Sequence, residues 1–272
     1  MTRGKILLLG DSITQMSFSP EGGWGGRLSD RYQRRLDVIN RGFSGYNTSW
    51  LLEHAATEDG RSDLFDHGPG GTVKLVTIFF GANDAAHAEL NGRQHVPLET
   101  YMSNLKKIVG LVRENLGEEV SVVLISPPPV CHEGRLRFQR ERYGDKATGK
   151  LERTLELSGK YARAAGVVAQ GLGLPFLDLW TTMQFDESSF EERGNWRGYL
   201  SDGLHLSPKG NKFVADALLG LIDGQVPHLS VTPCPITGNI NSASTCVGLE
   251  RTAPWHDEID TKHPGDAFSK SE

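Results

Sequence analysis

Three polar side chains in this 272-residue chain could together perform nucleophilic catalysis. Ser12 follows an apolar run that ends in Gly-Asp-Ser, and Asp202 and His205 share the short segment Asp-Gly-Leu-His. A serine hydroxyl becomes a strong nucleophile when a histidine takes its proton, and a carboxylate can hold that imidazole in the right tautomer. Taken singly, Gly-Asp-Ser also suits a turn with a helix cap, and His205 could simply help to cap the next helix.

The same chemistry needs hydrogen-bond donors for the negative charge that develops on a carbonyl oxygen during attack. The candidates are the backbone N–H groups of Ser12 and Gly45 and the side-chain amide of Asn83. Each lies at or just after the end of a different predicted strand. Asn83 could instead stabilise its own turn, and the segment around Gly45 could be an ordinary strand-to-helix turn.

Short, mostly apolar runs bounded by turn residues predict the strands that position these groups. The predicted strands are residues 5–9, 37–40, 73–80, 120–126 and 174–179. The predicted helices are residues 27–36, 49–57, 96–116, 151–172 and 208–222, with 58–71 as a loop and 180–193 as a helix or irregular segment. Alternating strands and helices favour a parallel, doubly wound sheet, in which ligands bind beyond the carboxyl ends of the strands. We therefore expect Ser12, Gly45 and Asn83 to meet at one rim.

Composition indicates a soluble globular protein, with 38% hydrophobic and 23% charged residues. The net charge of −5 does not indicate nucleic-acid binding, which is typical of basic surfaces. No apolar run approaches the roughly 20 residues of a membrane helix, and no signal-type segment begins the sequence. Cys131, Cys234 and Cys246 are too few and too scattered for a disulfide framework or a zinc cluster. We expect a cytoplasmic protein with no nucleic-acid partner and no stable membrane insertion.

The order and local sequence of these blocks resemble the SGNH or GDSL hydrolase family. The blocks are Gly-Asp-Ser, Ser44-Gly45, Gly-Ala-Asn-Asp and Asp-Gly-Leu-His, within residues 5–222. The phrases Arg-Gly-Phe-Ser-Gly-Tyr-Asn-Thr and Ile-Phe-Phe-Gly-Ala-Asn-Asp-Ala look like the isoamyl acetate-hydrolysing esterase group, as does the tail around Pro254-Trp255. The Arg-rich segment after Pro129 and residues 227–247 differ from that group, and either could reshape the pocket.

This resemblance implies a flavodoxin-like three-layer α/β/α sandwich around a five-stranded parallel sheet. It implies Ser12 as nucleophile, His205 as base and Asp202 as orienting acid, with Ser12, Gly45 and Asn83 as the oxyanion hole. It implies no metal and no cofactor. The expected substrate is a small or medium carboxylic ester of acetate type, hydrolysed through an acyl-Ser12 intermediate, and a homodimer is a candidate assembly.

The sequence suggests one catalytic domain with an appendage. Residues 1–226 form the expected hydrolase domain, and residues 227–272 form an extended tail that packs on it in part. Residues 132–149 carry four arginines, which favours a solvated helix or loop over an anion site, although their place after a strand makes them a candidate lid. The candidate substrate-pocket residues are Phe43, Val130, Phe138 and Leu204.

Two other functions use the same fold. An acyltransferase or tailoring enzyme of secondary metabolism would form the same acyl-enzyme and pass the acyl group to another alcohol. A non-catalytic binding protein has no need for Ser12, Asn83, Asp202 and His205 together, so their presence argues against it. A Rossmann dinucleotide binder is excluded, because no Gly-x-Gly-x-x-Gly follows the first strand.

Overall fold

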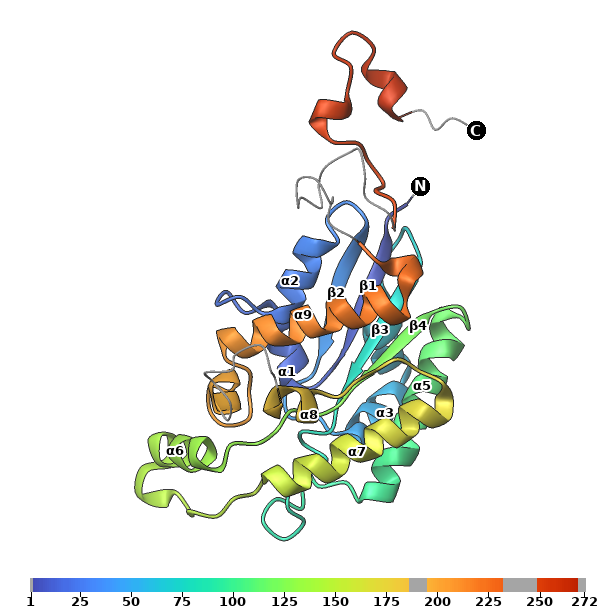
Figure 1. Cartoon of the computed structure of the whole chain (residues 1–272). Coiled ribbons are helices and arrows are strands. Elements are labelled where there is room, and N and C mark those ends of the chain that lie inside the picture. Colours follow the sequence, from blue (N-terminus) through green and yellow to red (C-terminus); the bar gives the residue numbers. More distant parts are fainter. Residues whose placement is uncertain (1, 186–194, 232–248, 269–272) are drawn as a thin grey trace.

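The computed structural model describes residues 2–185, 195–231 and 249–268. Within these residues, five parallel strands form one sheet in the order β2-β1-β3-β4-β5 (Figure 1). The strands are β1 (Gly4–Gly10), β2 (Leu36–Gly42), β3 (Val73–Phe79), β4 (Ser121–Ile125) and β5 (Phe176–Leu177). This is the flavodoxin-like order, and it confirms the predicted α/β fold and all five predicted strands.

Helices cover both faces of the sheet, so the molecule has two apolar cores. Along β1, Ile6 and Leu8 belong to one core and Leu7 and Leu9 to the other, as the alternation of side chains in a strand requires. The first core is covered by α2 (Trp24–Arg31), α8 (Leu179–Gln184) and α9 (Pro208–Gln225). The second is covered by α3 (Thr48–Ala56), α4 (Glu58–Phe65), α5 (Leu98–Leu116) and α7 (Leu155–Leu172) (Figure 1).

The strand order reverses between β1 and β3. The chain passes from β1 to β2 on one side and then returns to place β3 on the other side of β1. In open α/β sheets, this switch point is where a ligand-binding crevice forms. The segments that follow β1, β2 and β3 carry Ser12, Gly45 and Asn83 respectively, so the topology brings all three to one edge.

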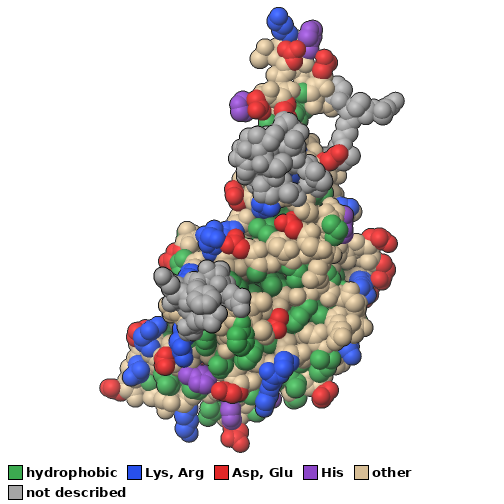
Figure 2. All heavy atoms as spheres, viewed as in Figure 1, with side chains coloured by type: hydrophobic (Ala, Val, Ile, Leu, Met, Phe, Trp, Pro, Cys, Tyr) green, Lys and Arg blue, Asp and Glu red, His purple; other side chains and the backbone are tan. Residues whose placement is uncertain are grey.

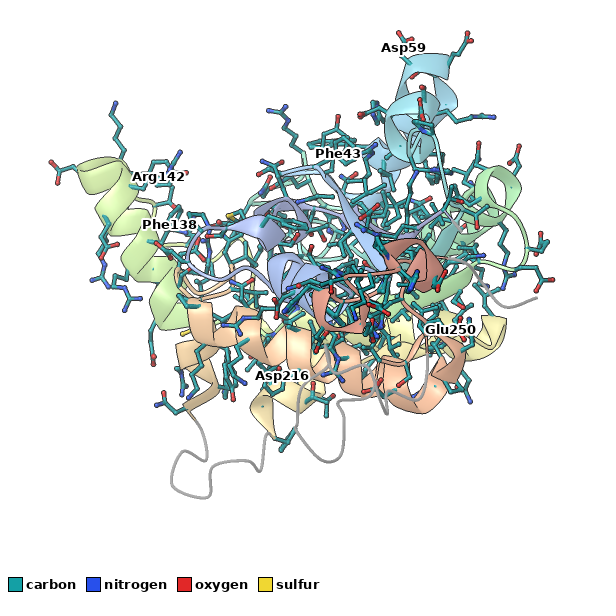
Figure 3. All side chains as sticks on the ribbon, turned by 90° about the horizontal axis from the view of Figure 1, so that it is seen from above. Phe43, Asp59, Phe138, Arg142, Asp216 and Glu250 are labelled. Carbon is teal, nitrogen blue, oxygen red and sulfur yellow. The ribbon has the colours of Figure 1, made fainter. Side chains whose placement is uncertain are left out.

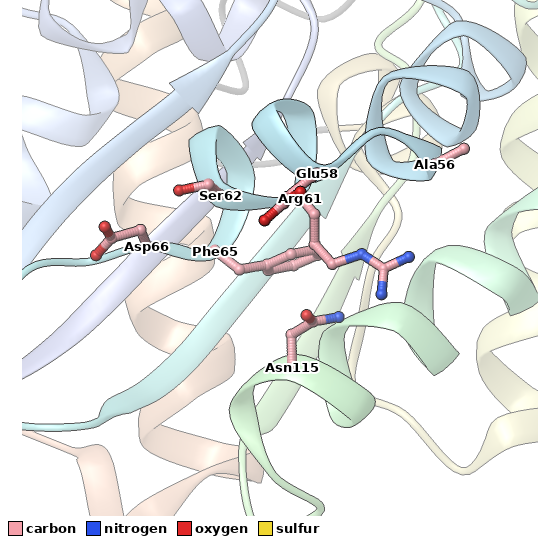
Figure 4. A pocket seen from close by; sticks show the side chains of 7 residues that line it. All are labelled: Ala56, Glu58, Arg61, Ser62, Phe65, Asp66 and Asn115. Atoms are coloured by element: carbon pink, nitrogen blue, oxygen red, sulfur yellow. The ribbon is translucent and has the colours of Figure 1, made fainter.

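One prediction about local structure is wrong, because residues 58–65 form helix α4 instead of a loop. The Thr57 hydroxyl accepts a hydrogen bond from the Gly60 N–H at 3.0 Å, and Glu58 and Asp59 lie in the first turn, where acidic groups favour a helix. Leu64 and Phe65 are buried in the second core. Figure 4 shows a shallow pocket between α4 and α5, lined by Ala56, Glu58, Arg61, Ser62, Phe65, Asp66 and Asn115.

Several helix boundaries are set by caps that the sequence only partly revealed. The predicted helix over residues 27–36 begins at Trp24 and ends at Arg31, which frees Leu36 to begin β2. Pro97 precedes α5 instead of occupying its first turn. Ser207 caps α9, since its hydroxyl accepts from the Gly210 N–H at 3.1 Å.

Two further helices border the carboxyl edge of the sheet. They are α1 (Ser12–Gln15), directly after β1, and α6 (His132–Tyr143), in the connection after β4. Short 3₁₀ helices lie at Met16–Phe18, Gly144–Lys146, Asn195–Tyr199, Pro227–Leu229, His256–Glu258 and Pro264–Phe268.

The C-terminal tail contacts the domain at the start of β2, far from the edge that carries Ser12 (Figure 1). Arg35 Nε donates to the Leu249 carbonyl at 2.9 Å, and the Thr252 N–H donates to the Arg34 carbonyl at 2.7 Å. The Arg34 guanidinium lies over the Trp255 ring, 3.6 Å from its centroid. Cys234 and Cys246 lie outside the described residues.

The surface is mixed in charge. Figure 2 shows Lys and Arg side chains interspersed with Asp and Glu over the visible face. None of the helices in the described ranges is both long enough and apolar enough to cross a bilayer. The cytoplasmic location and the homodimer stay predictions.

Candidate active site

Ser12, His205 and Asp202 form one hydrogen-bonded chain at the carboxyl edge of the sheet. Ser12 Oγ lies 2.9 Å from His205 Nε2, and His205 Nδ1 lies 2.9 Å from Asp202 Oδ2. An ionised carboxylate only accepts hydrogen bonds, so Nδ1 carries the proton and Nε2 is left to accept the serine proton. The arrangement can generate a serine nucleophile.

The start of α1 presents the Ser12 hydroxyl. Asp11 caps this helix, and its Oδ1 accepts from the Ile13 N–H at 2.9 Å. The glycine before it has no room for a side chain, because a Cβ at Gly10 would lie 2.1 Å from Thr14 Oγ1. Helix α1 therefore begins only two residues after the end of β1, which places Ser12 at the carboxyl edge of the sheet.

The loop before α9 organises the acid and the base by local bonds. Asp202 Oδ1 accepts from the N–H groups of Leu204 and His205 at 3.0 and 2.8 Å. Gly203, which lies between Asp202 and Leu204, has φ +83°, a conformation that favours glycine. The Ser201 N–H donates to the His205 carbonyl at 2.8 Å and closes the loop.

Asp202 is held in its ionised form. Burial by itself acts to raise its pKa, but the hydrogen bond and charge of His205 oppose this. Together with the backbone N–H groups of His205 and Leu204, they lower the pKa of Asp202 well below its ordinary value. A carboxylate that stays ionised keeps accepting the imidazole proton, which maintains the tautomer that Ser12 needs.

Arg135 is a candidate site residue that the sequence does not reveal. The solvated helix or loop expected at residues 132–149 is wrong for this side chain, which is 5% exposed. Arg135 Nη1 lies 3.1 Å from Asp202 Oδ2, and Nη2 lies 2.8 Å from Glu152 Oε1. Gln139, one turn further along α6, is also buried, but nothing in the sequence distinguishes Arg135 from the other arginines of this segment.

Gly45 and Asn83 follow the two strands that flank β1. Gly45 follows β2 with φ +82°, and Asn83 follows β3 and is 4% exposed. Asn83 Nδ2 donates to the Tyr46 carbonyl at 2.8 Å, so it bonds to the neighbouring loop and not to its own turn. This nitrogen carries two hydrogens, and the second is available to another acceptor.

Two further carboxyl groups are buried beside the site. Burial raises the pKa of Asp11 to about 7 and that of Asp84 to about 6, even though Thr48 donates two hydrogen bonds to Asp84. One oxygen of each carboxyl has no hydrogen-bond partner among the described residues. Within those residues, no group of three or more His, Cys, Asp and Glu side chains is arranged to hold a metal ion.

The four predicted pocket residues lie in different surroundings. Val130 and Leu204 are buried in the first core. Phe43 packs against Tyr46, with ring centroids 5.2 Å apart. Phe138 lies on α6 under the Arg135 guanidinium, away from Phe43 and near Arg142 (Figure 3). Their role as pocket walls stays a prediction.

Comparison with known proteins identifies the family. The model of the GDSL-like Lipase/Acylhydrolase family matches residues 8–213. A GDSL esterase/lipase of Arabidopsis thaliana is 39% identical over 273 residues, which cover 98% of each chain. The human isoamyl acetate-hydrolyzing esterase 1 homolog is 45% identical over 228 residues, covering 83% of this chain and 84% of its own. These matches confirm the resemblance stated from the sequence blocks.

Solved structures share the fold at low sequence identity. A lipase/acylhydrolase from Enterococcus faecalis is similar with a TM-score of 0.56 and 24% identity, over 82% of this chain and 96% of that one. A catalytic mutant of an acetylxylan esterase from Geobacillus stearothermophilus is similar with a TM-score of 0.56 and 20% identity, over the same shares. The family match and the identity to the relatives show that this chain belongs to the GDSL-like lipase/acylhydrolase family and is a carboxylic-ester hydrolase.

Proposed function

We propose that this protein hydrolyses small carboxylic esters of acetate type through an acyl-Ser12 intermediate. The observation that carries the proposal is the chain from Ser12 Oγ through His205 to Asp202, with both contacts at 2.9 Å. These are distances at which a base can take the proton of a nucleophile.

The proposed cycle has two halves. Ser12 Oγ attacks the ester carbonyl while its proton passes to His205 Nε2, and the tetrahedral intermediate forms. The alcohol then leaves with that proton, which gives the acyl-enzyme. Water attacks the acyl group with His205 again as base, and the carboxylic acid leaves as Ser12 regains its proton.

Donors at the rim stabilise the charge that develops on the carbonyl oxygen. We assign this role to the N–H groups of Ser12 and Gly45 and to the second hydrogen of Asn83 Nδ2. Such donors cost nothing to reorganise during the reaction, because the fold already holds them in place. The position of the three groups after β1, β2 and β3, at the switch point of the sheet, supports the assignment.

The relatives support the acetate preference. Several of them, from human, mouse, rat and cattle, are named isoamyl acetate-hydrolyzing esterase 1 homologs. We keep Phe43, Val130, Phe138 and Leu204 as candidate walls of the acyl and alcohol pockets.

A series of p-nitrophenyl esters with graded acyl length tests the proposal. We expect the highest kcat/KM at acetate and a fall as the acyl chain lengthens, with no turnover by Ser12→Ala. Turnover by Ser12→Ala equal to that of the wild type would contradict the mechanism. Adding isoamyl alcohol to the reaction distinguishes hydrolysis from transfer, since a transferase would accumulate isoamyl acetate instead of acetate.

A further inference from the structure

One buried arginine contacts Asn83 of the predicted oxyanion hole directly, and it reaches Gly45 through Gln94. Arg153 lies just before α7 and is 6% exposed. Its Nε donates to the Ala82 carbonyl at 2.9 Å, which fixes the guanidinium plane beside the end of β3. Its Nη2 donates to Asn83 Oδ1 at 2.9 Å and to Gln94 Oε1 at 2.6 Å.

These contacts determine which way two side-chain amides face. A guanidinium has only donors, so the amide atoms that meet it must be oxygens. Asn83 is therefore turned with Oδ1 toward Arg153 and Nδ2 away from it. Gln94 is turned in the same sense, with Oε1 toward Arg153, which leaves Nε2 as a donor for the other side.

Gln94 extends this control to Gly45. Gln94 Nε2 donates to the Gly45 carbonyl at 2.9 Å and to Asn83 Oδ1 at 3.1 Å. Glycine has the widest choice of backbone conformations, so a glycine that must aim its N–H at a substrate needs an external tether. The bond from Gln94 supplies one, and Arg153 fixes the amide that makes it.

We propose that Arg153 and Gln94 are positioning residues of the oxyanion hole, setting the direction of the Asn83 amide and of the Gly45 backbone. The inference rests on the proposed function, because it concerns donors assigned to the transition state there. The cation has a second effect. A charge-assisted bond to Asn83 Oδ1 polarises the amide and strengthens the bond that its N–H groups can donate.

Glu152 balances the charge of this arrangement. Its Oε1 lies 3.4 Å from Arg153 Nη1 and 2.8 Å from Arg135 Nη2. Burial acts to raise the pKa of Glu152, but the hydrogen bond and charge of Arg135 and the charge of Arg153 outweigh burial and lower it. The same carboxylate thus connects the support of Asn83 with that of Asp202, which Arg135 contacts.

The isosteric change Gln94→Glu tests the proposal. A carboxylate still accepts from Arg153, but it places an acceptor where Nε2 donates to Gly45 and Asn83. We expect kcat to fall about 10- to 100-fold, as a small displacement of catalytic groups can cause, with little change in KM. The melting temperature, measured on the same preparation, shows whether the loss of kcat comes with a loss of folding.

Two further variants keep the test independent of folding. Arg153→Lys retains the charge but lacks the planar fork that reaches the Ala82, Asn83 and Gln94 oxygens, so kcat should fall while KM holds. Arg35→Lys is the matched control. Arg35 is 3% exposed and donates to Leu249 far from the site, so its change should leave kcat unaltered.

Labelling of Ser12 by a phosphonate separates this inference from the proposed function. If Ser12 takes the label and Asn83→Ala lowers kcat, but Gln94→Glu and Arg153→Lys keep the wild-type kcat, the inference is overturned and the function stands. If Ser12 takes no label, both are overturned. A loss in Gln94→Glu that becomes smaller in an Asn83→Ala background supports the inference, since it shows that Gln94 acts through Asn83.

Discussion

The proposed acid–base side of the site and its proposed oxyanion side are held in different ways. Asp202 and His205 share one short loop, and Asp202 Oδ1 secures that loop through the N–H groups of Leu204 and His205. Gly45 and Asn83 come from separate loops after β2 and β3, and Gln94 and Arg153 hold them from elsewhere in the chain. The first side is organised by bonds within one loop, to which Arg135 of α6 adds a contact with Asp202, whereas the second depends on tertiary contacts throughout.

This difference predicts which step of the reaction a substitution on each side would impair. A change on the acid–base side should act on the proton transfers and leave the loop in place, because its backbone bonds are short-range. A change on the oxyanion side should act on transition-state stabilisation, either by deleting a donor or by turning it.

Among variants that keep Ser12, Asp202→Asn should cause the largest loss. The Asn oxygen can still accept from the loop N–H groups, but the amide cannot hold the His205 tautomer that leaves Nε2 as an acceptor. In a serine protease such a change costs about 10⁴-fold in kcat, and we expect a loss of the same order. Steady-state kinetics with p-nitrophenyl acetate would measure it, with the melting temperature as the check on folding. A folded variant with near-normal kcat would contradict the assignment of Asp202 as the residue that orients His205.

Asn83→Ala should cause a smaller but still large loss. Removing one oxyanion donor typically costs roughly 2.7–4 kcal/mol in kcat, about a hundred- to a thousandfold. KM should change much less, because the amide meets a charge that exists only after attack. Measuring kcat, KM and melting temperature on one preparation distinguishes this role from structural support of the Tyr46 loop. A lowered melting temperature with near-normal kcat well below it would assign Asn83 to the loop alone.

Asp11→Asn should alter stability with pH. Burial raises the pKa of Asp11 in the folded protein from its ordinary value of 3.8 to about 7. Between these values the folded state holds a proton that the unfolded state has lost, so the unfolding free energy falls as pH rises toward 7. The asparagine should remove this loss of unfolding free energy, which is on the order of 4 kcal/mol at pH 8.

Denaturant unfolding at pH 5 and pH 8 would measure the effect. Asn can still accept from the Ile13 N–H, so the helix cap is retained in the variant. The wild type should lose more stability than Asp11→Asn between the two pH values, with a remaining slope from Asp84. Equal losses in both proteins would show that Asp11 is already ionised at pH 5.

The contrast between local and long-range contacts also explains which features the sequence could predict. The five strands could be predicted because each is a short apolar run. Ser12, Asp202 and His205 could be predicted as site residues because each lies in a distinctive local motif. Helix α4 was missed because its cap and its two buried apolar residues are set among charged ones.

Arg135, Arg153 and Gln94 could not be identified from the sequence as site residues. Arginines in a charged segment are usually solvated, and nothing local distinguishes the two that are buried against Glu152. Their roles depend on contacts with residues far along the chain, such as the bond from Arg153 to Asn83. Long-range partners of this kind become visible only in the folded structure.

The most direct test of the account is to trap the acyl-enzyme. Wild-type protein mixed with p-nitrophenyl acetate and quenched in acid within the first turnover should carry one acetyl group, and peptide mass spectrometry should place it on Ser12. The Ser12→Ala variant, treated in the same way, should carry none. An acetyl group on another residue that forms and decays at the rate of turnover, or unchanged turnover by Ser12→Ala, would contradict the account.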